Sequence, residues 1–333
     1  MRTVALVAVA AALSAGCSEG KASSPARASG CSAVRPMRPA SRALSAFFPS
    51  RSALLLRGRR CVFLVGRSRT ATRLLWAGRR SESVRGLGWS PDGQSIAITM
   101  KSSHDGWRVV ILRPDGAVQR RLRATGIAYF RDGHAVISRR DGIYLQPGFR
   151  RLATRAELQP VAGFRLRTAV AVSPDPFGYG RGYGRKSVAL TLWGGPSASK
   201  STVLVVSADG RVTRASPAYR AGGGEGSVLG WTWSPKGRDL YVTAELVPRG
   251  WHGPGDHDHC VEVWSAERGR RRAFCGSSFP RAERTHFARL VWATNGKTGL
   301  LDNGTVITEH WTHAGRVHVP AAAFELQSQP TGA

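Results

Sequence analysis

Acidic side chains are scarce in this chain. Only 21 Asp and Glu stand against 49 Lys and Arg in 333 residues, which gives a formal net charge of +28. A chain with so few acidic residues is a poor candidate for an enzyme whose site needs several carboxylates close together. A surface this basic attracts phosphates, anionic lipid headgroups and acidic polymers. The basic runs are only two to four residues long, so we expect no nucleic-acid-binding tail.

Helical patterns and common catalytic motifs are also missing. After the first 16 residues, no run of ten or more residues keeps apolar spacings of three and four without Gly or Pro. There is no Gly-x-Ser-x-Gly elbow and no P-loop, which argues against a peptidase-type hydrolase and a nucleotide-binding fold. The segment "GYGRGYG" at 178–184 lacks dinucleotide-binding spacing. We interpret it as a loop between strands; the alternative is that Tyr179, Arg181 and Tyr183 stack on a sugar or base.

The N-terminus holds the one secretion signal. A positive start, "MR", precedes the short apolar stretch "TVALVAVAAALSAG" and Cys17, which is the pattern of a signal peptide. The ending "LSAGC" resembles the lipobox of bacterial lipoproteins, although Ser14 stands where a larger aliphatic residue is usual. The resemblance implies removal of residues 1–16, lipid on Cys17, and attachment to the cell membrane on its extracytoplasmic face. The alternative is an ordinary signal peptide with a chance cysteine.

Four further cysteines remain, and an even number in an exported chain indicates disulfides. Cys260 and Cys275 enclose two short strand patterns around a Gly-containing turn. A hairpin with that register places the two cysteines opposite each other, so we predict that they pair. Pairing of Cys31 with Cys61 follows by elimination.

The stretch "WSPDG", from Trp89 to Gly93, marks a repeated unit. Pro91 presets one backbone angle, Asp92 favours a turn, and Gly93 accepts a positive φ. Ser90 helps to fix the turn, and Trp89 is expected to pack between units. Echoes of this aromatic–turn–strand pattern begin near residues 126, 228 and 289. A second hairpin follows several of them, so that the unit consists of four strands.

Six such units predict an all-β fold, a six-bladed β-propeller of four antiparallel strands per blade. The units average about 45 residues, the period of a propeller blade. Their approximate bounds are 52–79, 84–122, 124–153, 163–215, 226–275 and 286–320. The expected organisation is a signal peptide at 1–16, a flexible tether at 17–50, a propeller at 51–322 and a C-terminal tail at 323–333.

The "WSPDG" motif followed by an alternating strand resembles the repeat of TolB-like, WD-repeat-like propellers of bacterial envelopes, and that of the propeller in prolyl-oligopeptidase-type peptidases. The resemblance covers about residues 52–320 and implies a binding or scaffolding role toward an envelope protein. The net charge suggests an anionic membrane surface or wall polymer as a further partner. We expect a monomer that binds no nucleic acid.

A His-rich loop is the candidate for a metal-binding site. The loop at 249–260, "RGWHGPGDHDHC", brings together His252, Asp256, His257 and His259, whose side chains suit zinc or copper. No standard ligand spacing is met, so we expect a solvated loop and no cofactor. The rival functions are a propeller enzyme of hydrolase or lactonase type and a metal- or ligand-binding sensor.

Overall fold

Six sheets, each built around four antiparallel strands, follow one another along the chain in the computed structural model. The structure describes residues 31, 44–48, 51–68, 71–163, 165–166, 171–172, 180–181, 183–194, 200–216, 225–247, 258–275, 287, 289–293, 295–319, 323 and 327–330. Residues 31–333 form one compact unit. Among the described residues, no helix is long and apolar enough to span a membrane.

Each of the first three sheets has four strands, which are named below in the order of their pairing. The first sheet contains β25 (Gln327–Ser328), β1 (Ala53–Arg57), β2 (Cys61–Val65) and β3 (Thr72–Ala77). The second contains β4 (Glu82–Trp89), β5 (Ile96–Ser102), β6 (Gly106–Leu112) and β7 (Val118–Leu122). The third contains β8 (Gly126–Tyr129), β9 (Ala135–Ser138), β10 (Gly142–Leu145) and β11 (Arg150–Thr154).

The other three sheets follow the same plan, with one additional strand in the fifth. The fourth contains β12 (Ala171–Val172), β14 (Ser187–Gly194), β15 (Lys200–Ser207) and β16 (Val212–Ser216). The fifth contains β13 (Gly180–Arg181), β17 (Glu225–Trp233), β18 (Asp239–Val247), β19 (Asp258–Ser265) and β20 (Gly269–Cys275). The sixth contains β21 (Leu290–Trp292), β22 (Thr298–Leu301), β23 (Thr305–Thr308) and β24 (His313–Arg316).

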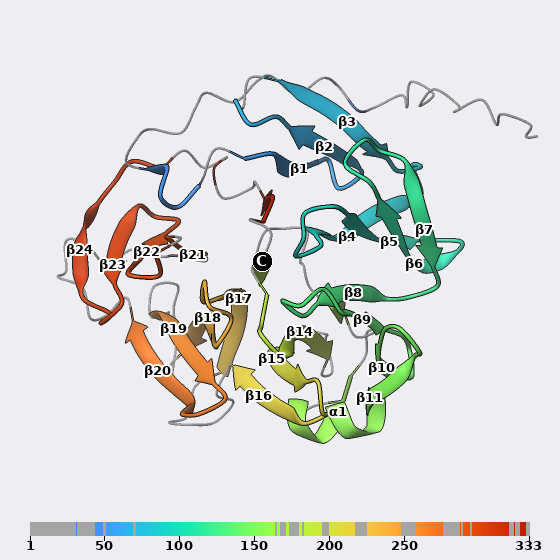
Figure 1. Ribbon diagram of the computed structural model, residues 1–333. Helices are drawn as coiled ribbons and strands as arrows, with labels where there is room; N and C mark the ends of the chain where they lie inside the picture. Colours follow the sequence, from blue (N-terminus) through green and yellow to red (C-terminus); the bar gives the residue numbers. More distant parts are fainter. Residues whose placement is uncertain are drawn as a thin grey trace, which may run out of the picture. The chain divides into compact units, whose positions relative to one another are not determined.

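Within residues 31–333 the sheets succeed one another around a common centre, with β4, β8 and β17 near it and β7, β20 and β24 on the outside (Figure 1). This arrangement is a six-bladed β-propeller. It confirms the predicted fold class, and each predicted unit corresponds to one sheet.

The apolar residues of the middle strands pack in two directions. In β5, Ile96, Ile98 and Met100 belong to a core shared with the first sheet, whereas Ala97 belongs to a core shared with the third. Successive side chains of a strand point to opposite faces, so one strand fills both interfaces. Burial on both faces explains why β5 begins with three consecutive apolar residues, Ile96, Ala97 and Ile98.

The C-terminal strand completes the first sheet. β25 pairs antiparallel with β1, with Ala53 opposite Ser328 and Leu54 opposite Gln327. The propeller is thereby closed by strands from both ends of the described chain (Figure 1). The sheet extends past residue 322, where the sequence predicts that the propeller ends and a tail begins. The two residues of β25 are too few to show a period.

One short helix, α1 (Arg155–Ala162), lies between the third and fourth sheets. Thr154 and Glu157 form a capping box at its start, because the threonine Oγ1 accepts from the Glu157 amide at 3.1 Å and the carboxylate accepts from the Thr154 amide at 2.6 Å. Gly163, with φ of +78°, ends the helix. With eight residues, α1 is too short to produce a helical apolar pattern over ten or more residues.

Candidate functional site

The "WSPDG" stretch forms a tight turn between β4 and β5. The Gly93 amide donates to the Ser90 carbonyl at 2.9 Å, and the Ser95 amide donates to the Ser90 hydroxyl at 2.9 Å. Asp92 accepts from the Gln94 amide at 3.0 Å, and Gly93 has a φ of +69°. Trp89 is buried in the core between the first two sheets. Each of these polar groups therefore serves the turn itself.

The corresponding turns of the third, fifth and sixth sheets repeat this hydrogen bonding. The Gly133, Gly237 and Gly296 amides donate to carbonyls three residues earlier at 2.8–3.0 Å. All three glycines have positive φ. The same backbone geometry thus recurs from sheet to sheet, as a fold built from repeats requires.

These turns also contact one another from sheet to sheet. The Arg131 amide donates to the Gly184 carbonyl at 3.0 Å, and the Arg131 side chain reaches the Pro235 carbonyl at 2.8 Å. The Gln329 side chain donates to the Gly93 carbonyl at 2.9 Å. The turns therefore lie on one face of the propeller, which we call the turn face.

The end of the Gly-rich segment, Tyr183 and Gly184, lies on the turn face. Tyr183 donates its hydroxyl to the Trp89 carbonyl at 2.7 Å, and burial, with Tyr129 and Asp92 nearby, raises its pKa. A Cβ on Gly184 would lie 2.2 Å from the Ser187 carbonyl oxygen and 2.7 Å from the Trp233 ring. The glycine is therefore required by close packing, and the Tyr183 side chain is engaged within the fold.

The other two residues of the suggested stacking set are less fully described. Tyr179 lies outside the described residues. Arg181 belongs to β13, which pairs parallel with β17, and its side chain is not among those described. Stacking of this segment on a sugar or base stays a prediction.

His252, Asp256 and His257 of the His-rich loop lie outside the described residues. His259 is the second residue of β19. Its Nδ1 lies 2.6 Å from the Phe287 carbonyl oxygen, and its Nε2 lies 4.0 Å from Glu245. The imidazole is only 12% exposed. His259 thus connects β19 with the segment that precedes the sixth sheet.

Potential metal-ligating atoms of Asp258, Cys260 and Cys275 lie within 4.8 Å of one another. The two sulfurs are bonded to each other in a disulfide, whereas cysteine binds metals as a thiolate. This group of three therefore does not form a cysteine-ligated site in the oxidised protein. The expectation of a solvated loop, and its alternative of zinc or copper binding, both concern residues outside those that the structure describes and stay untested.

Both cysteine pairs suggested by the sequence are disulfides in the structure. Cys260 is the direct strand partner of Cys275, with the Cα atoms 4.0 Å apart. Cys31 is joined to Cys61 at the start of β2, with the Cα atoms 5.8 Å apart. Cys17 lies outside the described residues, so its lipidation stays a prediction.

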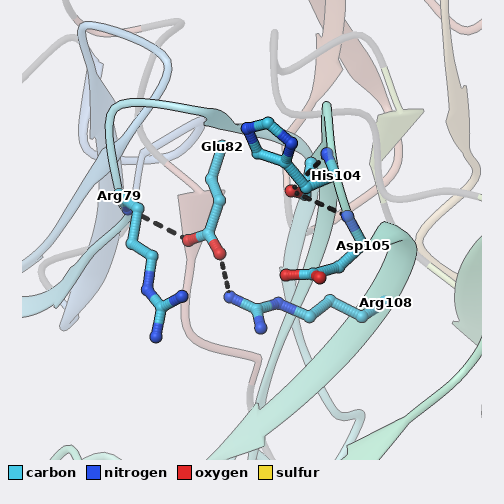
Figure 2. Close-up of polar contacts among 6 residues, drawn as sticks. Arg79, Glu82, His104, Asp105 and Arg108 are labelled. Atoms are coloured by element: carbon cyan, nitrogen blue, oxygen red, sulfur yellow. Dashed lines mark hydrogen bonds and ion pairs between the residues drawn. The ribbon is translucent and has the colours of Figure 1, made fainter.

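A buried ion pair in the second sheet was not suggested by the sequence. The side chain of Glu82 is 2% exposed and accepts from the Arg79 amide at 3.0 Å and from the Arg108 guanidinium (Figure 2). The nearby Ser102 hydroxyl accepts from the His104 and Asp105 amides at 3.1 and 3.2 Å. A single charged residue within a strand pattern does not indicate which residue of another strand will be its partner. Because the pair ties β4 to β6 across β5, its evident role is to hold the strand ends together.

The charged residues of the propeller are distributed by strand position. The outermost strands β3, β7, β11, β16, β20 and β24 contain no Asp, Glu or Lys. They contain ten arginines, which we call the arginine rim: Arg73, Arg120, Arg121, Arg150, Arg151, Arg214, Arg270, Arg271, Arg272 and Arg316.

Few rim arginines are neutralised within the fold. Among those whose side chains the structure describes, only Arg270 lies within ion-pair distance of a carboxylate, at 3.8 Å from Glu262. Arg73 and Arg150 donate to backbone carbonyls of neighbouring turns, which leaves their charge uncompensated. Charged outer strands also protect a sheet against edge-to-edge association.

The fold is similar to that of several solved propeller-type proteins. A prolyl endopeptidase matches with a TM-score of 0.45 and 13% identity over 85% of this chain and 45% of that chain. A gluconolactonase from Xanthomonas campestris matches with 0.38 and 17% over 81% and 85%. An oligogalacturonate lyase from Vibrio parahaemolyticus matches with 0.39 and 10% over 79% and 62%.

The chain spans less than half the length of the prolyl endopeptidase. No family model and no curated protein matches the chain. At these identities the similarity concerns the fold, and it assigns no activity. The chain is a six-bladed β-propeller, and its function has to be inferred from its own surface.

Proposed function

We propose that this protein is a binding or scaffolding protein of the bacterial cell envelope. It is anchored through lipid on Cys17 at the extracytoplasmic face of the membrane, and its propeller holds an anionic partner. The lipobox-like ending at residue 17 and the TolB-like repeat support this role. The two disulfides accord with an exported chain.

The arginine rim is the observation that carries the proposal. Arginine presents a planar fork of donors that matches carboxylate and phosphate groups. Ten of them on outermost strands without one acidic residue create a positive surface that steers anions toward the protein. The polar groups of the "WSPDG" turn, by contrast, are engaged in the fold. Recognition by the rim therefore fits the structure better than chemistry at the turns.

Crosslinking and pulldown from native membranes test the proposal. We expect a reproducible anionic partner at about 0.05 M salt and a several-fold smaller yield at about 1 M, because salt shortens the range of exposed charges. The double variant R120Q/R271Q should lower the yield several-fold, since both side chains are exposed. The matched control R120K/R271K keeps the charge and should retain most of it.

Two outcomes would contradict the proposal. A yield that neither salt nor R120Q/R271Q changes would mean that the rim is only a solvated edge. Co-purification of a metal or sugar without any reproducible partner would favour the sensor or enzyme alternative.

A further inference from the structure

An exposed aromatic side chain stands out on the third sheet. Phe149, in the turn between β10 and β11, is 40% exposed. Its φ of +53° lies in the left-handed region, which costs free energy for any residue but glycine. Core packing does not account for a phenylalanine at such a position. A strained and exposed aromatic residue is a reason to look for a binding role.

Arg139 lies between this ring and a second one. Its guanidinium carbon is 4.7 Å from the centroid of the Phe149 ring and 5.6 Å from that of Tyr144. Stacking on two rings restricts the rotamers of the arginine while its charge remains. The side chain is thus prepared for an anion at little further entropic cost.

The charge around this cluster is predominantly positive. Arg140, Arg150 and Arg151 are exposed beside it. The nearest acidic group, Asp141, accepts a hydrogen bond from the Tyr144 hydroxyl. That hydrogen bond, helped by Arg139 and Arg151, holds the pKa of Asp141 below its usual value. Asp141 offsets part of the charge of Arg139, but the exposed Arg140, Arg150 and Arg151 keep the surroundings of Arg139 net positive.

An apolar neighbour occupies the equivalent connection of the adjacent sheet. Val118, which begins β7 directly after the β6–β7 turn, is 43% exposed. Val118 and Phe149 are the exposed large hydrophobic residues among the part of the chain that the structure describes. Because β6–β7 and β10–β11 are corresponding hairpins of neighbouring sheets, both residues lie at the same end of the propeller.

We propose that Arg139, Tyr144 and Phe149 form a docking site for anionic phospholipid headgroups of the membrane. This inference rests on the proposed function, since a tethered domain is held close to the bilayer. Arg139 binds the phosphate, the neighbouring arginines add attraction to an anionic surface, and Phe149 enters the interfacial region. An exposed apolar ring gains free energy at a bilayer, whereas a soluble phosphate polymer offers it no apolar environment.

Vesicle binding by the full-length chain tests the site. The probes are vesicles of phosphatidylcholine alone and vesicles with about one third phosphatidylglycerol. The difference between them removes binding that does not depend on lipid charge, and the cationic N-terminal segment is the same in the wild type and in every variant, so it cancels when they are compared. R139Q should lower the anionic-lipid-dependent binding constant about fivefold, the effect of one arginine near an anionic surface. F149G should lower it by a similar or larger factor.

The glycine variant separates binding from folding. Glycine tolerates the positive φ of residue 149, so F149G should melt no lower than the wild type while it binds vesicles more weakly. R120Q, which removes an exposed rim arginine on β7 without ring contacts, serves as the matched control and should have a smaller effect than R139Q.

Three results would overturn the site. One is equal losses in R120Q and R139Q, which would indicate net charge alone. Another is unchanged vesicle binding by F149G. The third is wild-type binding to soluble polyphosphate that is as strong as binding to vesicles and independent of Phe149, which would indicate a polymer. If one of these three results is found while a salt-sensitive partner is still captured from membranes, the docking site fails and the proposed function stands.

Discussion

Tyr183 shows how a residue that is conspicuous in the sequence can be occupied by the fold. Its hydroxyl reaches the Trp89 carbonyl at the end of β4, and its ring packs against the core shared by the second and third sheets. Gly184, which follows it, is required because a side chain there would collide with the Ser187 carbonyl and the Trp233 ring. Spacing alone could not distinguish this packing from a ligand-stacking loop.

Replacing Tyr183 by Phe should lower the free energy of unfolding by about 1–2 kcal/mol, because a carbonyl inside the turn face loses its donor. The effect depends on pH. Below about pH 10 both folded and unfolded tyrosine are protonated. Above it the unfolded chain ionises first, since burial raises the pKa of folded Tyr183, so the wild type loses stability as pH rises. Urea unfolding from pH 8 to 11 should show a shallower alkaline loss in the variant.

The buried ion pair gives a second prediction at this scale. Glu82→Gln leaves Arg108 without its carboxylate, and we expect a loss of about 2 kcal/mol, moderated because Arg108 is partly exposed. The double variant E82Q/R108Q removes the unpaired charge and should recover at least half of that loss in urea unfolding. Equal losses in the single and double variants would show that the two residues do not act as a pair.

At the scale of elements, the hairpin of β19 and β20 was predictable because both strands and their turn are visible in the sequence. Its register places Cys260 opposite Cys275. The helix α1 was not predictable by periodicity, because its eight residues include Pro160 and few apolar positions. Its capping box is a local sequence signal for a helix start that does not depend on a long apolar pattern.

The disulfide of this hairpin should contribute measurably to stability. Cys260 and Cys275 are 15 residues apart, so C260S/C275S should lower the free energy of unfolding by about 3 kcal/mol in the chain-entropy account. Urea unfolding under oxidising conditions measures the loss. Reductant should reduce the stability of the wild type further than that of the variant, which retains only the Cys31–Cys61 bond. Identical stability of both oxidised proteins would contradict the prediction.

At the scale of the whole molecule, closure of the propeller depends on a very short strand. β25 pairs with β1, and Gln329 next to it reaches the turn of the second sheet. Without β25, β1 would present an unpaired edge, which is prone to association. The first and last parts of the described chain therefore support each other.

Truncation after residue 326 should lower the melting temperature by about 5–10 °C and increase self-association in size-exclusion chromatography. Removal of residues 331–333 alone is the matched control and should leave both unchanged. A truncated chain with the wild-type melting temperature would show that closure by β25 contributes little.

From the sequence it was possible to predict the repeated turn, the four-strand unit, the number of units and the Cys260–Cys275 pair. Each of these is local, because turn chemistry and the alternation of apolar residues are set by neighbours along the chain. Only the tertiary structure decided the closure through β25, the pairing of Glu82 with Arg108, and the gathering of arginines on the outermost strands. It also decided the stacking of Arg139 between two aromatic rings. The closure and the ion pair join residues from different parts of the chain, and the arginine rim depends on the place of each strand in its sheet. The contacts of Arg139 depend on how one hairpin folds. None of these features produces a periodic pattern in the sequence.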